Sequence, residues 1–108
     1  MVVDVRSADE YARGHLPGAI HVPVDQIPWR GAELPAGQVL TVCSTGNRAW
    51  RAAQALASTG RTALCLTGGT TAWTAAGLPL VTGQDAGSRT APGRLRRWRT
   101  ALRRRRSG

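Results

Sequence analysis

Four short apolar runs, separated by helix signals, constrain the fold of this chain more than any other feature. The runs are VVDV (2–5), AIHVP (19–23), VLTV (39–42) and ALCL (63–66). None of them alternates apolar with polar residues over a long stretch, and short continuous apolar runs are typical of strands buried on both faces. We therefore expect an α/β domain with a mainly parallel central sheet of about four strands.

The segments between the runs carry the signals of helices. SADE (7–10) is a capping-box pattern, in which Ser7 accepts from the N–H of Glu10 and the Glu10 side chain reaches back. Alanine and leucine recur at helical spacing in 48–59, and a further helix is predicted over 69–76. This alternation predicts a parallel sheet flanked by helices.

The positive charge of the chain is concentrated at its C-terminal end. All six acidic residues and six of the arginines lie before residue 86, whereas the other nine arginines follow it. The net charge of +9 therefore belongs to residues 86–108 rather than to the body of the protein. We divide the chain into a domain at 1–82, a linker containing Gly, Ser and Pro at 83–93, and an Arg-rich tail at 94–108.

The tail is open to three interpretations. Leu95, Trp98, Ala101 and Leu102 fall on one face of a predicted amphipathic helix, with arginines around the rest. Such a segment could be a disordered, solubilising extension, an interfacial helix on an anionic membrane, or a nucleic-acid contact through 94–106. The apolar face slightly favours the membrane, and the oligomeric state stays open.

Several classes of protein are not expected. Two cysteines in a chain of this length do not indicate a disulfide scaffold, and Asp4 and Arg6 interrupt any apolar run that could form a signal peptide. We expect a cytoplasmic protein, with a peripheral position at the inner face of the membrane left open because of the tail. The sequence shows no metal-ligand cluster and no nucleotide loop, so neither a metal nor another cofactor is expected.

Cys43 follows directly on the third apolar run, where a strand gives way to a helix. In a parallel sheet, ligands bind at the carboxyl ends of the strands. The residues after Cys43 are small or polar and end in a cation: Ser44, Thr45, Gly46, Asn47 and Arg48. Their N–H groups can point at one centre and form an anion cradle that favours a Cys43 thiolate, while Arg48 could pair with the thiolate or with an anionic substrate.

The spacing within this loop separates two chemistries. Cysteine-type phosphatases need a loop one residue longer between cysteine and arginine, which would place the arginine at Ala49. The four residues between Cys43 and Arg48 favour a cysteine that carries one extra sulfur as a persulfide. Cys65 lies inside ALCL with neither Gly nor Arg after it, and we expect it in the core.

Three stretches of the chain resemble the signatures of single-domain rhodaneses, in the same order and spacing. DVRSADEYARGHLPGAIHVP (4–23) is similar to the first signature, VCSTGNRA (42–49) to the active-site loop, and LTGGTTAWTAAGLPL (66–80) to the closing signature. The resemblance implies a rhodanese-like three-layer sandwich. It also implies a sulfurtransferase that moves a sulfane sulfur from a small donor, such as thiosulfate or a persulfide, to a thiol or protein acceptor.

The resemblance also assigns roles to residues. It maps the persulfide-forming cysteine onto Cys43 and the cradle onto 44–48. It implies structural support from a wider set, in which the glycines allow close approach to the active loop and the tryptophan anchors the core: Asp4, Arg6, Glu10, His15, Gly68, Gly69 and Trp73.

The chain departs from the family in two places. Most members have a helix and a short strand before the first apolar run, which here begins at position 2. We therefore expect either that the given start of the chain is too late or that the sheet lacks its N-terminal edge element. Ser44 and Thr45 are uncharged, whereas loops tuned for thiosulfate often carry basic residues there, although Arg48 could compensate.

Two other functions remain as alternatives. One is a rhodanese-like binding module without activity, a class usually marked by loss of the cysteine that is retained here as Cys43. The other is a phosphatase or arsenate reductase, which the loop length disfavours.

Overall fold

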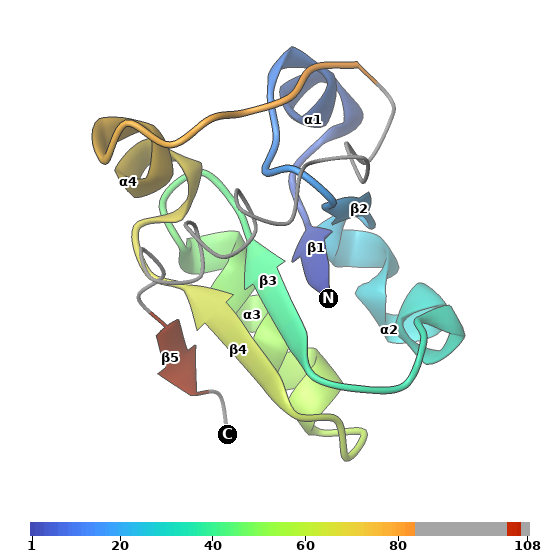
Figure 1. The fold of residues 1–108 in the computed structure, drawn as a ribbon. Coiled ribbons are helices and arrows are strands. Elements are labelled where there is room, and N and C mark those ends of the chain that lie inside the picture. The colour runs from blue at the N-terminus through green and yellow to red at the C-terminus, as the bar shows by residue number, and fades with distance from the viewer. Residues whose placement is uncertain (84–103, 107–108) are drawn as a thin grey trace.

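A computed structural model describes residues 1–83 and 104–106 of the chain (Figure 1). None of the helices in these ranges is both long enough and apolar enough to cross a membrane. The strands and α-helices follow in the order β1 (Val2–Asp4), α1 (Ala8–Arg13), β2 (Ile20–His21), α2 (Ile27–Arg30), β3 (Val39–Val42), α3 (Asn47–Ala57), β4 (Ala63–Leu66), α4 (Gly69–Ala75) and β5 (Arg104–Arg106). Two 3-10 turns, η1 (Val24–Gln26) and η2 (Gly31–Glu33), flank α2.

The first four strands form the parallel sheet that the sequence predicts. The strand order is β2-β1-β3-β4-β5, so β3, which leads to Cys43, lies in the middle. Thr41 on β3 is opposite Val3 on β1 and Cys65 on β4, and β1, β2, β3 and β4 run in the same direction. The mainly parallel sheet is therefore confirmed.

A fifth strand from the Arg-rich tail extends this sheet. Arg104–Arg106 pairs antiparallel with β4, with Arg105 opposite Cys65, and so occupies the edge of β4. Edge strands leave backbone N–H and C=O groups unpaired, and pairing with β5 satisfies those of β4. The predicted helix is wrong for these three residues, while the rest of the tail and all of the predicted linker beyond Gly83 lie outside the described residues.

Helices cover both faces of the sheet and give the three layers that were predicted (Figure 1). Val39 and Cys65 point toward α3 and belong to one core cluster with its buried alanines and leucine. The next residue along β3, Leu40, belongs to a second cluster with Tyr11 of α1 and Trp73 of α4. Adjacent strand residues thus face opposite layers, as side chains alternate along a strand.

The parallel arrangement positions the candidate site. Because β1, β3 and β4 run in the same direction, the segments that follow them lie at the same end of the sheet. These segments begin at Val5, Cys43 and Thr67. The capping box predicted at Ser7 and Glu10 is present at the start of α1, the helix that follows β1.

Candidate active site

Cys43 lies one residue beyond β3, and its sulfur accepts hydrogen bonds from two backbone donors. The residue is 1% exposed. Its Sγ accepts hydrogen bonds from the N–H of Gly46 at 3.0 Å and from the N–H of Ala49 at 3.3 Å. One donor comes from the loop and the other from the first turn of α3. Both would stabilise negative charge on the sulfur, as N–H groups at a helix N-terminus do.

The conformation of Gly46 makes this arrangement possible. Gly46 is the N-cap of α3 and has φ 119° and ψ −18°, a left-handed conformation that side chains other than glycine rarely adopt. The turn brings the N–H groups of Gly46 and Ala49 to the Cys43 sulfur. Four other N–H groups of the loop have no acceptor among the described residues, those of Ser44, Thr45, Asn47 and Arg48. The loop therefore keeps donors available for a sulfur or an oxyanion next to Cys43.

The segment after β4 holds the loop from the other side. Gly69 has φ 58°, and a Cβ added there would collide with the carbonyl oxygens of Cys43 and Ser44. This close approach allows Thr70 N–H to donate to Cys43 O at 2.9 Å and Thr71 N–H to donate to Ser44 O at 3.1 Å. The start of α4 thus fixes the peptide groups of Cys43 and Ser44.

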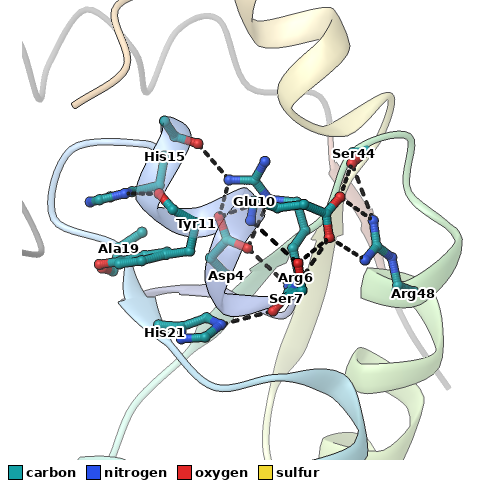
Figure 2. Close-up of polar contacts among 11 residues, drawn as sticks. Asp4, Arg6, Ser7, Glu10, Tyr11, His15, Ala19, His21, Ser44 and Arg48 are labelled. Carbon is teal, nitrogen blue, oxygen red and sulfur yellow. Dashed lines mark hydrogen bonds and ion pairs between the residues drawn. The ribbon is translucent and has the colours of Figure 1, made fainter. Parts of the chain in front are cut away.

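A carboxylate from α1 reaches the same loop (Figure 2). Glu10 Oε1 accepts from Arg48 Nη1 at 2.8 Å, and Glu10 Oε2 accepts from Arg48 Nη2 at 3.1 Å. Glu10 Oε2 also accepts from Ser44 Oγ at 3.1 Å, and Arg48 Nη2 donates to the same hydroxyl at 3.2 Å. Arg48, which the sequence suggested as a partner of the thiolate or the substrate, is therefore paired with Glu10 in this structure.

The pairing shifts the titration of both groups. The hydrogen bonds from Arg48 hold the pKa of Glu10 far below its usual range, against a smaller opposing effect of burial and with further help from Ser7. The same bonds raise the pKa of Arg48, and the charge of Cys43 contributes as one of the smaller causes. Glu10 and Arg48 are consequently both charged over the whole range in which the protein would work.

The residues assigned to structural support surround this network. Asp4 and Arg6 form a buried ion pair with an N–O distance of 2.7 Å, and Arg6 Nη2 also donates to Gly14 O at 2.6 Å. His15 is fully buried, its Nδ1 lies 2.7 Å from Tyr11 O, and its ring stacks on that of Tyr11 with centroids 3.6 Å apart. These contacts fix the end of α1 against β1 and so position Glu10 (Figure 2).

Trp73 lies in the core cluster between the sheet and the helices α1 and α4. Cys65 lies in the core cluster under α3, and it also lines a small cavity beside the loop. Trp73 is 3% exposed on α4, and its Nε1 donates to Pro79 O at 2.7 Å. Gly68, with φ 82°, is the N-cap of that helix. Cys65 is 2% exposed and is not part of a disulfide.

A small cavity lies beside the loop. It has a volume of about 90 Å³ and lies between the start of α3 and the end of β4, with Thr45, Gly46, Trp50 and Thr67 in its lining. A wider depression of about 790 Å³ lies near the amino ends of β3 and β4, at the opposite end of the sheet. Within residues 1–83 and 104–106, no group of three or more His, Cys, Asp or Glu side chains is placed to hold a metal ion.

Comparison with known proteins decides the family. The family model for the rhodanese-like domain matches residues 1–76 of this chain. The chain belongs to the rhodanese-like domain family. A relative of this rhodanese-like chain, a sulfurtransferase of Allochromatium vinosum, is 37% identical over 83 residues, which are 75% of this chain and 78% of the relative.

Solved structures of other rhodanese-like proteins share the fold. A rhodanese-related protein of Thermoplasma volcanium has a TM-score of 0.71 at 27% identity, over 74% of this chain and 81% of that protein. A thiosulfate sulfurtransferase of Pseudomonas aeruginosa has a TM-score of 0.68 at 33% identity, over 77% of this chain but only 17% of that protein. The resemblance read from the sequence is thus confirmed at the level of the family, and with it membership in a family of sulfurtransferases.

The sequence missed the part of the site that joins distant elements. Glu10 was assigned to support through its capping box, and its bonds to Arg48 and Ser44 were not foreseen. One signal in the sequence could have indicated this contact. Glu10 follows the predicted strand at 2–5, and parallel strands place the segments that follow them at the same end of the sheet.

Proposed function

We propose that this protein is a sulfurtransferase that carries the transferred sulfur as a persulfide on Cys43. The observation that supports this most directly is the position of the Cys43 sulfur, within 3.0 and 3.3 Å of two backbone N–H donors at the carboxyl end of β3. A persulfide places its terminal, negatively charged sulfur one bond further out. The remaining N–H groups of the loop are suited to bind that sulfur.

The reaction runs in two displacements with no net redox change. The Cys43 thiolate attacks the outer sulfur of a donor, the sulfur–sulfur bond of the donor breaks, and its electron pair leaves with the rest of the donor as sulfite or a thiolate. A nucleophile such as cyanide or an acceptor thiol then attacks the terminal sulfur of the Cys43 persulfide. The bond between the two sulfurs breaks, and its electron pair returns to Cys43 as a thiolate.

Mass spectrometry of the intact protein after incubation with a panel of sulfane donors tests the proposal. The wild type should gain one sulfur that a reductant removes and cyanide accepts. Cys43→Ser should gain none, while Cys65→Ser serves as the matched control and should behave like the wild type. If the wild type gains no sulfur from any donor and transfers none to cyanide, the proposal is wrong.

The two alternatives have less support from the molecule. A module without activity has no need of donors around a cysteine, and binding to a partner that survives Cys43→Ala would favour it. A phosphatase or arsenate reductase would require the longer loop, and release of phosphate from an aryl phosphate would reveal it. The loop between Cys43 and Arg48 has four residues.

We also propose a cytoplasmic location and a polyanionic partner for the Arg-rich tail, either anionic lipid at the inner face of the membrane or nucleic acid. A free thiol at position 43 is required by the chemistry, and a reducing compartment maintains it. Binding to anionic vesicles and to RNA, each measured over a range of salt concentrations with and without residues 92–108, distinguishes the two partners. Equal binding without those residues would contradict any such role of the tail.

A further inference from the structure

The side chains of the active loop carry no net charge once Glu10 is counted. Ser44, Thr45 and Asn47 are neutral, and the guanidinium of Arg48 is engaged through both of its terminal nitrogens by the two oxygens of Glu10, at 2.8 and 3.1 Å. The charge that could have compensated for the neutral residues is thus already paired inside the protein. An anionic donor would have to bind the cradle without a free cation from this loop.

Glu10 also lies beside the nucleophile itself. Its Oε2 accepts from the hydroxyl of Ser44 at 3.1 Å, and Ser44 is the residue that directly follows Cys43. Arg48 bridges the same hydroxyl and carboxylate, so the three side chains form one connected group (Figure 2). Glu10 and Arg48 side chains are 25% and 33% exposed, which places this group where the loop meets solvent. A donor that approaches from this side meets a carboxylate.

We propose that Glu10 selects the sulfur donor by its charge, favouring organic persulfides over the thiosulfate dianion. The inference rests on the proposed function and names the substrate class of the same site. Glu10 acts as a positioning residue, because it works through Arg48 and Ser44 and through its field rather than by contact with the reacting sulfur.

The chemistry of the two donors explains why this charge discriminates. Both donors give the same Cys43 persulfide, but they differ in the group that leaves. Thiosulfate releases sulfite, and the negative charge of this leaving group must be accommodated beside the loop. To bind that group, Arg48 would have to leave Glu10, and the carboxylate would then face a dianion unpaired. An organic persulfide R–S–SH loses RS⁻, which takes up the persulfide proton, so that no second charge has to be held at the loop.

The variant Glu10→Gln removes the charge and preserves the helix. Glutamine at this position of a capping box can still accept from the N–H of Ser7, so α1 keeps its N-terminal cap. The measurement is kcat/KM for thiosulfate divided by kcat/KM for cysteine persulfide, with cyanide as acceptor. We expect this ratio to rise about tenfold in Glu10→Gln, the order expected from removal of one neighbouring charge. Asp9→Asn, the same change of charge one residue earlier on α1 at an exposed position, is the matched control and should leave the ratio unchanged.

A second measurement compares the salt dependence of the wild type with that of Glu10→Gln, which share the same arginines and the same Cys43. Added salt screens the repulsion between Glu10 and a dianion, so the ratio should rise more with ionic strength in the wild type than in Glu10→Gln. An equal salt dependence of the two proteins, or an equal ratio at low salt, overturns the selection by Glu10 and leaves the persulfide mechanism standing. Absence of a Cys43 persulfide with both donors would instead overturn the proposed function.

Discussion

The two cysteines of this protein are equally buried and differ in almost everything else. Cys43 is 1% exposed and Cys65 is 2% exposed, both belong to the core cluster under α3, and neither is part of a disulfide. Cys65 lies within β4, with its backbone paired to Thr41 on one side and to Arg105 on the other. Cys43 lies just beyond β3, where the backbone turns into α3. Burial alone therefore does not distinguish the cysteine that we propose as the persulfide carrier from the cysteine of the core.

The difference lies in the backbone that follows each cysteine. After Cys65 the strand continues through Leu66, and its N–H groups belong to the ladders of the sheet. After Cys43 the chain turns at Gly46, and the N–H groups of Gly46 and Ala49 converge on the sulfur. The cradle of N–H groups therefore depends on the turn that follows Cys43 and not on the burial of the cysteine. Changes that displace this turn should remove the cradle.

Among the variants that test this comparison, we expect Gly69→Ala to cause the largest loss of activity. The new Cβ would collide with the carbonyl oxygens of Cys43 and Ser44, and the loop would have to move away from α4. A displacement of the nucleophile by about 1 Å can lower a rate by about a hundredfold, and we expect at least that loss in kcat/KM for sulfur transfer to cyanide. Circular dichroism and thermal unfolding should accompany the kinetics.

Gly77→Ala is the matched control for that change. Gly77 also has a positive φ, 79°, but a Cβ there would meet no atom within 4 Å. Both variants therefore pay the conformational cost of alanine at positive φ, about 1 kcal/mol, while only Gly69→Ala also pushes the loop. Equal activities of the two variants would show that the contact between Gly69 and the loop does not position Cys43.

Much of this architecture could be predicted because its signals are local. The apolar runs at 2–5 and 39–42, and the capping box at Ser7 and Glu10, each depend on neighbours in the sequence, and each is present in the fold. The same holds for the cradle, since a cysteine after a strand and a glycine three residues later predict a turn with inward N–H groups.

The rest depends on contacts that no local pattern contains. Glu10 and Arg48 are 38 residues apart, and their pairing arises only because the sheet brings α1 and the loop after β3 to the same end. The pairing of Arg104–Arg106 with β4 joins residues at least as far apart in the sequence, and a run of arginines has no alternation that would indicate a strand. The short helix Ile27–Arg30 begins with a proline in its first turn and is too short to show periodicity.

A smaller effect is expected in the rates at which the two thiols are alkylated, which compares them directly. Donors that stabilise a thiolate increase its reactivity, so iodoacetamide should modify Cys43 at least about tenfold faster than Cys65 in the folded protein. The rates can be followed by mass spectrometry of proteolytic peptides from samples quenched over time. After unfolding in guanidinium the two rates should converge. A faster reaction of Cys65 in the folded state would contradict the assignment of the cradle to Cys43.

The smallest effect is expected in the free energy of unfolding. It distinguishes the contribution of each cysteine to core packing from its contribution to sulfur transfer. Cys65→Ala removes one buried sulfur from the cluster under α3, and we expect the free energy of unfolding to fall by about 1 kcal/mol while the yield of persulfide stays unchanged. Cys43→Ala removes a sulfur of the same size but also leaves the buried N–H of Ala49 without its acceptor, so its loss should be larger, about 2 kcal/mol, with no persulfide formed. Chemical denaturation and the persulfide assay on the same samples measure both quantities. If Cys65→Ala reduced sulfur transfer as much as Cys43→Ala does, Cys65 would belong to the chemistry, and equal burial would in this protein mean equal function.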